Sequence, residues 1–565
     1  MPEAVAPVEL RVLEGPNIYF PRPAVKLTLA VPSWLRAADR RVERAMQALG
    51  VPGAAGAAGT ERRRRAVARL ATGLTRAVAA GAGVRRLAVR ARPGVEPDLI
   101  VVAFPWRRRG SAEALARAVS RGMAETLRRS PTRVVAELAE AVAAADPGPE
   151  PRLPDPDVPV IQVTGTNGKT TTVRLLAHIL EAAGRRVAYS STDGVYRDGR
   201  RVRKGDYSGF GGAAMALAQH PDVAVLETAR GGILQRGIGV RHNDVAVVTN
   251  VSADHLGLHG IESVDQLAEV KATITRITRP GGWDVLNADD PRVLAMRRHA
   301  TGRIWACSLD PENPAIRETL ADGGRATTVI DGRIAWFDGD EVHPVIAAAD
   351  VPVTIAGLSG MFTANALAAT AAALAVGLPA RAVARGLRSF IPDQDRNPGR
   401  ANLFTLDGRT VVIDYAHNEA GMAGLTEILA GLRPAGGRIW LAICTAGDRT
   451  DEILHGFAVR AAIGSDHLAI ADLIHYTRGR TAQEVYERLA AAAATAGVTD
   501  PPRYRGELHA LQEMFKGSRP GDVVCVTALG MRPQLFRWLA ARGASRLTPA
   551  DVQRRARAAA RSRGG

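Results

Sequence analysis

Residues 159–184 read PVIQVTGTNGKTTTVRLLAHILEAAG, and this stretch decides the fold class. The run 159–163 is apolar like a buried strand, and apolar residues from Val173 onward recur at helical spacing as far as Gly184. A turn with two glycines lies between them. The same alternation continues in the runs RVAYSS, DVAVLET, DVAVVTN and DVLNADD. The sequence therefore predicts a mostly parallel sheet that is covered by helices.

The turn VTGTNGKTTT has the features of a phosphate-binding loop. Gly165 and Gly168 let backbone N–H groups converge on a phosphate, Lys169 supplies positive charge, and the Thr170 hydroxyl can ligate Mg²⁺. The pattern G-x-x-x-x-G-K-[ST] is not met, because Val163 occupies its first glycine position. We interpret the turn as a shortened phosphate loop. The alternative is a helix-capping turn with a surface lysine.

Acids and an imidazole follow the ends of neighbouring predicted strands. Glu227 closes DVAVLE, Asn250 closes DVAVVTN, and Asp254 and His255 come shortly after. Ligands of open parallel sheets bind outside the carboxyl ends of the strands. We therefore expect Glu227 and His255 to hold Mg²⁺ beside the phosphate loop, although His255 alone reads as a capping or core histidine. His259 is interpreted as a surface residue.

Four further residues are weaker candidates. Lys271 lies in a predicted helix and, from the sequence alone, reads as a solvated charge. Asn287, in VLNADDP, fits an adenine contact and an Asx turn before Pro291 equally well. Arg400 is a candidate phosphate contact, and Asp414 is a strand-end acid that could bind ribose hydroxyls.

One linker divides the chain. Residues 146–159 hold six prolines and four acids, which makes them a stiff spacer. A second α/β unit, with the runs RTVVIDYAH, RIWLAIC, DHLAIAD and GDVVCVTA, starts near residue 393, and its polar loop 445–454 is a position for a second substrate. We predict an α/β protein with these parts: a basic α+β domain (1–145), the linker (146–159), a phosphate-loop central domain (160–392), a Rossmann-like domain (393–545) and a basic tail (546–565).

Local patterns predict further elements at both ends of the chain. In the N-terminal domain, VELRVLEG, AVKLTLAV, RRLAVRAR and DLIVVAFPW read as strands, and 111–144 reads as a helix broken near Ser130. The tail 546–565 is expected to be mobile, with a short helix in QRRARAAARSR as the alternative.

Positive charge is concentrated outside the middle of the chain. Of the net charge of +17, residues 1–150 contribute +11 and residues 546–565 contribute +5. This favours an acidic partner for the N-terminal region, such as a polyanionic acceptor, and its clusters at 62–65 and 107–109 are the candidate contacts. The alternative is that arginine replaces lysine on solvated faces.

The composition excludes several classes. It is that of an ordinary globular protein, and no apolar run is long enough to predict a membrane span or a secretory signal. Cys307, Cys444 and Cys525 fit neither a disulfide framework nor a zinc site, so we expect a cytoplasmic protein with reduced thiols. Aromatic residues make up 4% of the chain, which disfavours binding of nucleic acid by base stacking.

The motifs TGTNGKTT, LETARGGIL, TNVSADHLGLHG, VKATIT, LNADDP, PGR and DYAHN occur in this order. Together they resemble the Mur ligase superfamily, and more closely the Mur-like module of the cyanophycin synthetases. The stretch VELRVLEGPNIYFPRPAVKLTL is similar to the start of the same enzymes. Their ATP-grasp domain is missing here, where the proline linker takes its place, so we expect one ATP site.

The resemblance implies an ATP- and Mg²⁺-dependent ligase. In that family a carboxylate attacks the γ-phosphate, and an amine then displaces phosphate from the acyl phosphate. The implied catalytic residues are Lys169, Lys271 and His255. The implied nucleotide contacts are Gly165, Thr166, Asn167, Gly168, Lys169, Thr170, Thr171, Asn287 (adenine), Arg400 (phosphates) and Asp414 (ribose). The implied metal ligands are Thr170, Glu227, His255 and, if carbamylated, Lys271.

Several interpretations stay open at this point. The expected partners are amino acid or peptide substrates, an acidic acceptor and a second copy of the chain, with no membrane. A folylpolyglutamate-type or polyglutamate ligase is the alternative enzyme. A non-catalytic ATP-binding partner of a separate ligase and a nucleic-acid-binding ATPase are the alternatives of other classes.

Overall fold

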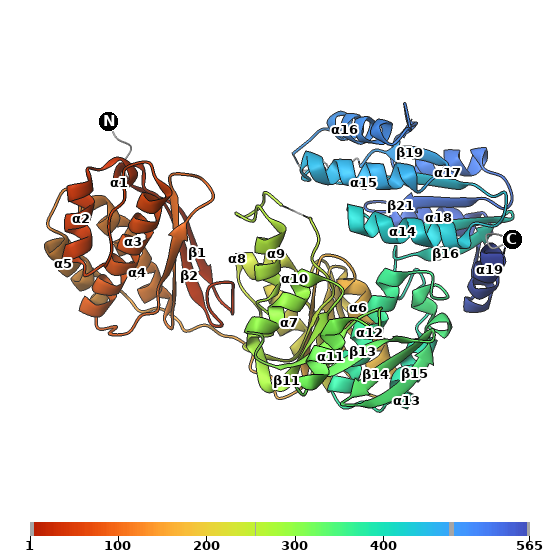
Figure 1. Cartoon of the computed structure of the whole chain (residues 1–565), viewed down its shortest axis with the longest axis horizontal. Coiled ribbons are helices and arrows are strands. Elements are labelled where there is room, and N and C mark those ends of the chain that lie inside the picture. Colours follow the sequence, from red (N-terminus) through yellow and green to blue (C-terminus); the bar gives the residue numbers. More distant parts are fainter. Residues whose placement is uncertain (1–4, 255, 474–478, 562–565) are drawn as a thin grey trace. The chain divides into compact units, whose positions relative to one another are not determined.

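The computed structural model describes residues 5–254, 256–473 and 479–561 (Figure 1). The chain forms two compact units. The first comprises Met1–Asp157, Tyr207–Ala218 and Thr228–His242, and the second comprises Val158–Asp206, Gln219–Glu227 and Asn243–Gly565. Within the described ranges, no helix is both long enough and apolar enough to cross a lipid bilayer.

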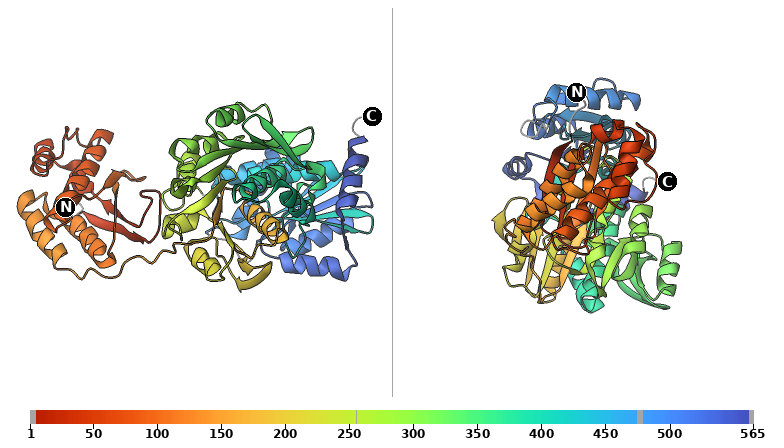
Figure 2. Two further views of the ribbon diagram at one scale, coloured as in Figure 1. Left: turned by 90° about the horizontal axis from the view of Figure 1, so that it is seen from below. Right: turned by 90° about the vertical axis from the view of Figure 1, so that its left-hand side faces the viewer.

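The first unit is built on a four-stranded antiparallel sheet in the order β1-β2-β4-β3. Helices lie on one face of this sheet (Figures 1 and 2). All four strands predicted here are present, although the strand predicted for 85–92 begins only at Arg90, and the helix predicted for 111–144 is broken before Pro131. Its elements are β1 (Ala6–Leu13), β2 (Ala24–Ala30), α1 (Pro32–Arg36), α2 (Asp39–Ala48), α3 (Glu61–Gly81), β3 (Arg90–Pro93), β4 (Leu99–Pro105), α4 (Arg109–Glu125), α5 (Pro131–Ala143), α7 (Phe210–Leu217) and α8 (Arg230–Gln235).

The second unit contains an eleven-stranded sheet in the order β15-β14-β13-β12-β11-β10-β5-β9-β6-β7-β8. The strands from β13 to β6 run parallel, and an antiparallel hairpin extends each end of that parallel region. The strands are β5 (Val160–Thr164), β6 (Val187–Ser191), β7 (Gly194–Arg197), β8 (Arg200–Lys204), β9 (Val223–Glu227), β10 (Asn243–Val248), β11 (Thr278–Asn287), β12 (Arg303–Cys307), β13 (Arg325–Ile330), β14 (Arg333–Asp338) and β15 (Glu341–Ala347).

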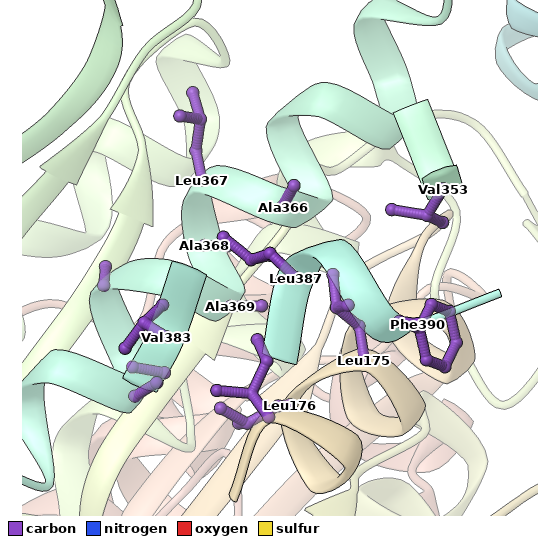
Figure 3. Packing of buried hydrophobic residues seen from close by; sticks show 14 of the residues in the cluster. Leu175, Leu176, Val353, Ala366, Leu367, Ala368, Ala369, Val383, Leu387 and Phe390 are labelled. Atoms are coloured by element: carbon purple, nitrogen blue, oxygen red, sulfur yellow. The ribbon is translucent and has the colours of Figure 1, made fainter. Parts of the chain in front are cut away.

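The helix that begins directly after the glycine-rich turn, α6, packs against two other helices beside this sheet, α12 and α13. Leu175 and Leu176 of α6 pack among alanines of α12 and against Leu387 of α13 (Figure 3). A Cβ at Gly386 would lie 2.7 Å from the Ile179 Cα, so α13 approaches α6 backbone to backbone. The helices around this sheet are α6 (Lys169–Ala182), α9 (Val264–Lys271), α10 (Pro291–Leu294), α11 (Pro314–Ala321), α12 (Gly360–Ala375) and α13 (Ala380–Ser389).

A seven-stranded sheet in the order β20-β19-β18-β21-β17-β16-β22 completes the second unit. Its strands from β20 to β17 are parallel, and β16 and β22 are antiparallel additions. The elements are β16 (Asn402–Leu406), β17 (Arg409–Asp414), α14 (Glu419–Leu432), β18 (Ile439–Ile443), α15 (Asp451–Ile463), β19 (His467–Ala471), α16 (Ala482–Thr495), β20 (Arg503–Tyr504), α17 (Glu507–Gly517), β21 (Val523–Thr527), α18 (Arg532–Ala541), β22 (Ser545–Arg546) and α19 (Pro549–Arg561).

The C-terminal segment is not the mobile tail that its basic composition suggested. It forms α19, drawn in dark blue alongside the outer strands of the seven-stranded sheet (Figures 1 and 2). Arg555 donates hydrogen bonds to the hydroxyls of Thr405 and Thr410 in this sheet. Gln553 donates to the Ala349 carbonyl, which follows β15 of the other sheet. The helix therefore contacts both sheets of the second unit.

Candidate active site

The glycine-rich turn joins the end of β5 to the first residue of α6. Gly165 has a φ of +150° and Gly168 a φ of +88°, which L side chains rarely adopt. A Cβ at Gly165 would lie 1.9 Å from the Thr249 Oγ1, and one at Gly168 would lie 2.2 Å from the Asn365 Oδ1. Both positions therefore require glycine, for conformation and for space.

Two residues after β10 hold the turn in shape. Asn250 Oδ1 accepts from the Asn167 backbone N–H at 2.8 Å, and Asn250 Nδ2 donates to the Asn167 carbonyl at 3.0 Å. The Asn250 carbonyl accepts from the Thr166 N–H at 2.8 Å, and the Thr249 hydroxyl donates to the Asn167 carbonyl at 2.6 Å. The sequence marked Asn250 only as a strand end, because the pairing of β10 with β5 cannot be read from the order of residues.

Glu227 and Thr170 meet at the start of α6, as the sequence predicted for neighbouring strand ends. The Thr170 hydroxyl donates to Glu227 Oε2 at 3.0 Å, and the Thr192 N–H donates to the same oxygen at 3.3 Å. Among the described residues, no group donates to the other carboxylate oxygen, Oε1, although it is buried. Burial raises the pKa of the Glu227 carboxyl, and the charge of Lys169 opposes that rise.

This arrangement fits a small divalent cation. A buried carboxylate oxygen with no donor, beside a hydroxyl, matches the oxygen ligands of Mg²⁺, which takes one or two carboxylates and completes its shell with phosphates and water. The described residues hold no group of three His, Cys, Asp or Glu side chains that could bind a metal alone. His255, the other predicted ligand, lies outside the described residues.

Two lysines converge on one carbonyl of the turn. Lys169 Nζ donates to the Gly165 carbonyl at 3.0 Å and to the Thr166 carbonyl at 2.9 Å. Lys271 Nζ donates to the same Gly165 carbonyl at 2.7 Å. Burial lowers the pKa of Lys169, and the charges of Glu227 and other acids oppose this shift. Lys271 ends α9 and is only 3% exposed, so its interpretation as a solvated charge is wrong.

Arg400, a predicted phosphate contact, lies just before β16, and Asp414, the predicted ribose contact, ends β17 of the seven-stranded sheet. The Arg400 guanidinium lies over the Tyr415 ring at 4.0 Å, and its positive charge acts on both Glu227 and Lys169. Asp414 accepts backbone N–H donors at 2.7 Å on each carboxylate oxygen, from Ala401 and Ala416. Burial raises the pKa of Asp414, and Arg400 opposes that rise. Asp414 therefore fixes the backbone at Ala401, the residue after Arg400. Its contact with ribose stays a prediction.

Two other predicted contacts make internal bonds. Asn287 forms the Asx turn, since its Oδ1 accepts from the Asp289 N–H at 3.0 Å, while its Nδ2 donates to the Thr249 carbonyl at 2.8 Å. Thr171 is buried, with its hydroxyl 3.5 Å from the Asn397 amide nitrogen. The adenine contact of Asn287 and the phosphate contact of Thr171 stay predictions.

Asn167, an implied nucleotide contact, joins side chains that the sequence did not single out in connecting the two sheets. Asn167, in the turn, and Asn418, before α14, exchange two side-chain hydrogen bonds of 3.1 Å. Asp193 lies between Arg174 of α6 and Arg532 of α18, at 2.8 and 3.1 Å. The motifs TNG and DYAHN contain the two asparagines, but no pattern in the sequence pairs residues 251 positions apart.

The polar loop 445–454 also reaches the eleven-stranded sheet. Arg449 forms an ion pair of 3.1 Å with Asp254, the residue before His255, and a second of 2.6 Å with Asp448. His417 Nε2 lies 3.6 Å from the other carboxylate oxygen of Asp254. Acidic and basic side chains from both sheets thus meet beside the phosphate loop.

Comparison with known proteins gives two family matches. Residues 163–373 match the Mur ligase middle domain, and residues 399–530 match the Mur ligase glutamate ligase domain. Cyanophycin synthetases of Geminocystis herdmanii and Trichormus variabilis are 41% and 38% identical over 316 and 365 residues, which are 56% and 64% of this chain. The matched parts are 36% and 40% of those two enzymes, so the chain spans well under half of their length.

More distant relatives match a similar share of the chain. A UDP-N-acetylmuramoyl-L-alanyl-D-glutamate–2,6-diaminopimelate ligase of Alkalilimnicola ehrlichii is 28% identical over 66% of this chain and 71% of its own. A solved bifunctional folylpolyglutamate synthase/dihydrofolate synthase with Mn, AMPPNP and L-glutamate bound has a TM-score of 0.50 and 19% identity, over 68% of this chain and 89% of that one. FolC of E. coli in complex with ADP also has a TM-score of 0.50, with 22% identity over 68% of this chain and 90% of that one.

These two structures share their fold with about two thirds of this chain. The motifs in the turn, at Glu227 and at Arg400 lie inside the matched ranges. Residues 163–373 and 399–530 of this chain are therefore the middle and glutamate ligase domains of the Mur ligase family.

Proposed function

We propose that this chain is an ATP- and Mg²⁺-dependent ligase that joins an amine to a carboxylate through an acyl phosphate. The observation that carries the proposal is the buried Glu227 Oε1, to which no described residue donates, on a carboxylate that accepts from the Thr170 hydroxyl at the phosphate loop. The relatives of this chain are named as cyanophycin synthetases and as UDP-N-acetylmuramoyl-peptide ligases, which supports the same reaction class.

The charges of the site suit phosphoryl transfer to a carboxylate. Both reactants are anions, so their approach requires positive charge that is already in place. Lys169, Lys271 and Arg400 supply it from three different elements. To reach a phosphate, the Lys169 ammonium leaves the Gly165 and Thr166 carbonyls and carries its charge to the oxygens that become more negative in the transition state.

Mg²⁺, when bound, supplies further positive charge to the phosphate oxygens. In this chain Thr170 and Glu227 would hold it, together with His255. Glu227 must be ionised to do so, and Lys169 favours that state.

The second substrate enters between the two sheets. Asp254, His417 and Arg449 place charged and hydrogen-bonding groups beside the phosphate loop, and they come from both sheets. This position allows an amine to reach the acyl phosphate while the contacts between the sheets exclude water from it.

The proposal extends to the acceptor and to the location of the protein. The net charge of +11 in residues 1–150 supports an acidic acceptor, and Arg62, Arg65 and Arg107 are exposed.

Three free, buried cysteines support a cytoplasmic location, where thiols stay reduced.

The test is the identity of the product. The whole chain is incubated with ATP, Mg²⁺, pooled amino acids and short aspartate-containing peptides, and products are identified by mass spectrometry alongside release of ADP and phosphate. We expect a product whose mass is that of the carboxylate plus that of the amine minus one water, since the acyl oxygen leaves in phosphate, and we expect Lys169→Ala to abolish it. Lys516→Ala, on the exposed surface of α17, is the matched control and should keep activity.

Nucleotide binding without any amide product would contradict the proposal and favour a non-catalytic role. Products from glutamate alone would identify a polyglutamate-type ligase.

A further inference from the structure

Strand β8 forms one edge of the eleven-stranded sheet and carries an unusual run of positive charge. Its sequence is RRVRK, and all five residues are exposed. Four of the five are arginine or lysine. Within the described chain, none of these four forms an ion pair with an acid. The outer side of β8 therefore offers free main-chain groups next to unneutralised cations.

Protection of an exposed edge does not account for this composition. A charged residue or a proline is enough to keep a second chain from pairing with an edge strand. At the opposite edge of the same sheet, β15 carries Glu341 and Pro344 and has no lysine or arginine. Strand β8 instead concentrates charge of one sign, which attracts anions.

The hairpin of β7 and β8 begins and ends at the candidate active site. Before β7, the Thr192 N–H donates to Glu227. After β8, the charge of Asp206 acts on Lys169. Lys204 pairs with Gly194, two residues after Thr192, so this end of β8 is next to the site and the Arg200 end leads away from it.

We propose that the outer edge of β8 binds an acidic peptide in extended conformation, and that this peptide is the carboxylate acceptor. This inference rests on the ligase function and the acidic acceptor proposed above, and it adds a binding surface for that acceptor on the second unit. An extended peptide can pair with the free main-chain groups of an edge strand, while its acidic side chains meet Arg200, Arg201, Arg203 and Lys204. The pairing of β8 with β7 is irregular at Val202, which has no partner on β7, so the five residues span at most about 17 Å, enough for about four or five peptide residues.

The surface fits a peptide better than a nucleic acid. Single strands of DNA and RNA bind to proteins by stacking their bases on aromatic side chains. Strand β8 has no aromatic residue. The tyrosines of the adjoining strands, Tyr189 and Tyr196, are buried and stack on each other with ring centroids 4.5 Å apart.

The experiment compares two triple variants of the whole chain that remove the same charge. One is Arg200→Gln/Arg201→Gln/Arg203→Gln on β8. The matched control is Arg381→Gln/Arg385→Gln/Arg388→Gln on the exposed side of α13. The probe is a fluorescent oligo-aspartate peptide, measured by anisotropy at several salt concentrations. We expect the β8 variant to bind it about tenfold more weakly and with a shallower salt dependence, the size expected for the loss of three exposed charge contacts. The control should bind like the unaltered chain.

A further variant and a competitor distinguish binding at β8 from misfolding and from a general affinity for polyanions. Arg200→Lys/Arg201→Lys/Arg203→Lys should restore affinity, which would exclude misfolding as the cause of the loss. Equal affinities in the unaltered chain, the β8 variant and the control would overturn the proposal, as would equal loss in both glutamine variants. Equally strong competition by a single-stranded oligonucleotide of the same charge would also overturn it, in favour of a general polyanion surface.

The proposed surface and the proposed ligation can fail separately. The KM for oligo-aspartate should rise in the β8 variant, while the KM for ATP stays unchanged. If ADP and an amide product form but the peptide binds away from β8, the surface is refuted and the ligase stands. If β8 binds the peptide but no acceptor yields ADP, the surface stands and the ligase function is refuted.

Discussion

Glu227 is the residue on which the site depends most, and its burial has a measurable cost. Its carboxyl has a raised pKa in the folded chain, so the folded state holds this proton more tightly than the unfolded state does. The stabilisation of the folded chain by this proton is fully present below the ordinary pKa of a glutamate, about 4.3. It is lost as the pH rises through the higher pKa that Glu227 has in the folded chain. A bound cation would offset this loss.

We therefore predict opposite effects of Glu227→Gln on stability and on activity. Without divalent cations, the variant should become more stable than the unaltered chain as the pH rises, because glutamine carries no charge into the core. The ATP-dependent reaction should fall about 100-fold, because a ligand for Mg²⁺ is lost. Thermal melts from pH 4 to 8 and ADP release measure the two effects. A variant that is less stable at pH 8, or that keeps full activity, would contradict this assignment.

Arg63 belongs to one of the arginine clusters expected to contact an acidic partner, but it has a structural role. Its side chain is fully buried, and its guanidinium donates to the carbonyls of Trp34 and Ala37 and pairs with Asp39. Its Nε donates to the carbonyls of Ala55 and Gly56, so Arg63 also holds the loop before α3 in place. A loss of binding after neutralising the whole cluster would therefore be ambiguous.

We predict that Arg63→Ala lowers the free energy of unfolding of the first unit by about 3 kcal/mol, because buried carbonyls lose their donors. Arg62→Ala, at the exposed neighbouring position, should change it by less than about 0.5 kcal/mol. Urea denaturation measures both. Equal effects would mean that Arg63 is not the anchor of this loop.

At the scale of elements, the prediction from sequence succeeded where strands are short and fully buried. Runs such as VIQVT and VAVLE are mostly apolar and every residue in them is buried, and β5 and β9 form where they were expected. The hairpin of β7 and β8 was missed because RRVRK has almost no apolar residues, so its strand conformation depends on pairing with β7. The buried position of Lys271 was missed for a related reason, since burial depends on elements far away in the sequence.

Helix α19 shows how composition can mislead. Its arginines suggested a solvated tail, but Val552, Ala556 and Ala559 recur at helical spacing and are buried. Val552 joins the large apolar cluster that also contains the residues of α6 and α12.

We predict that Val552→Asp detaches α19. A buried charge without a partner is costly, so the helix should leave its position, and the chain should lose about 3 kcal/mol of stability with the apolar surface that becomes exposed. Trypsin should then cleave after the arginines of the helix. Arg557→Asp, on the exposed face of the same helix, is the control and should leave the helix protected. Equal cleavage of both variants would show that Val552 does not hold the helix.

At the scale of the whole molecule, the family matches cover the second unit well and leave other parts unmatched. The two matched ranges end at residue 530, whereas β22 and α19 lie beyond it. The sequence predicted the order of the α/β parts, because each has its own run of apolar strands. It could not predict the contacts between the sheets, such as that of Asn167 with Asn418, because these depend on how distant parts of the chain pack.

The position of α19 restricts how the two sheets of the second unit can separate. The chain passes between them once near residue 400, and α19 adds a second attachment through Gln553 and the Ala349 carbonyl. A body fixed at a single point can turn in every direction, but one fixed at two points rotates only about the line through both. The separation should therefore follow a single axis and widen on the side where Asn167 meets Asn418, and this is the side from which we expect small molecules to enter and leave.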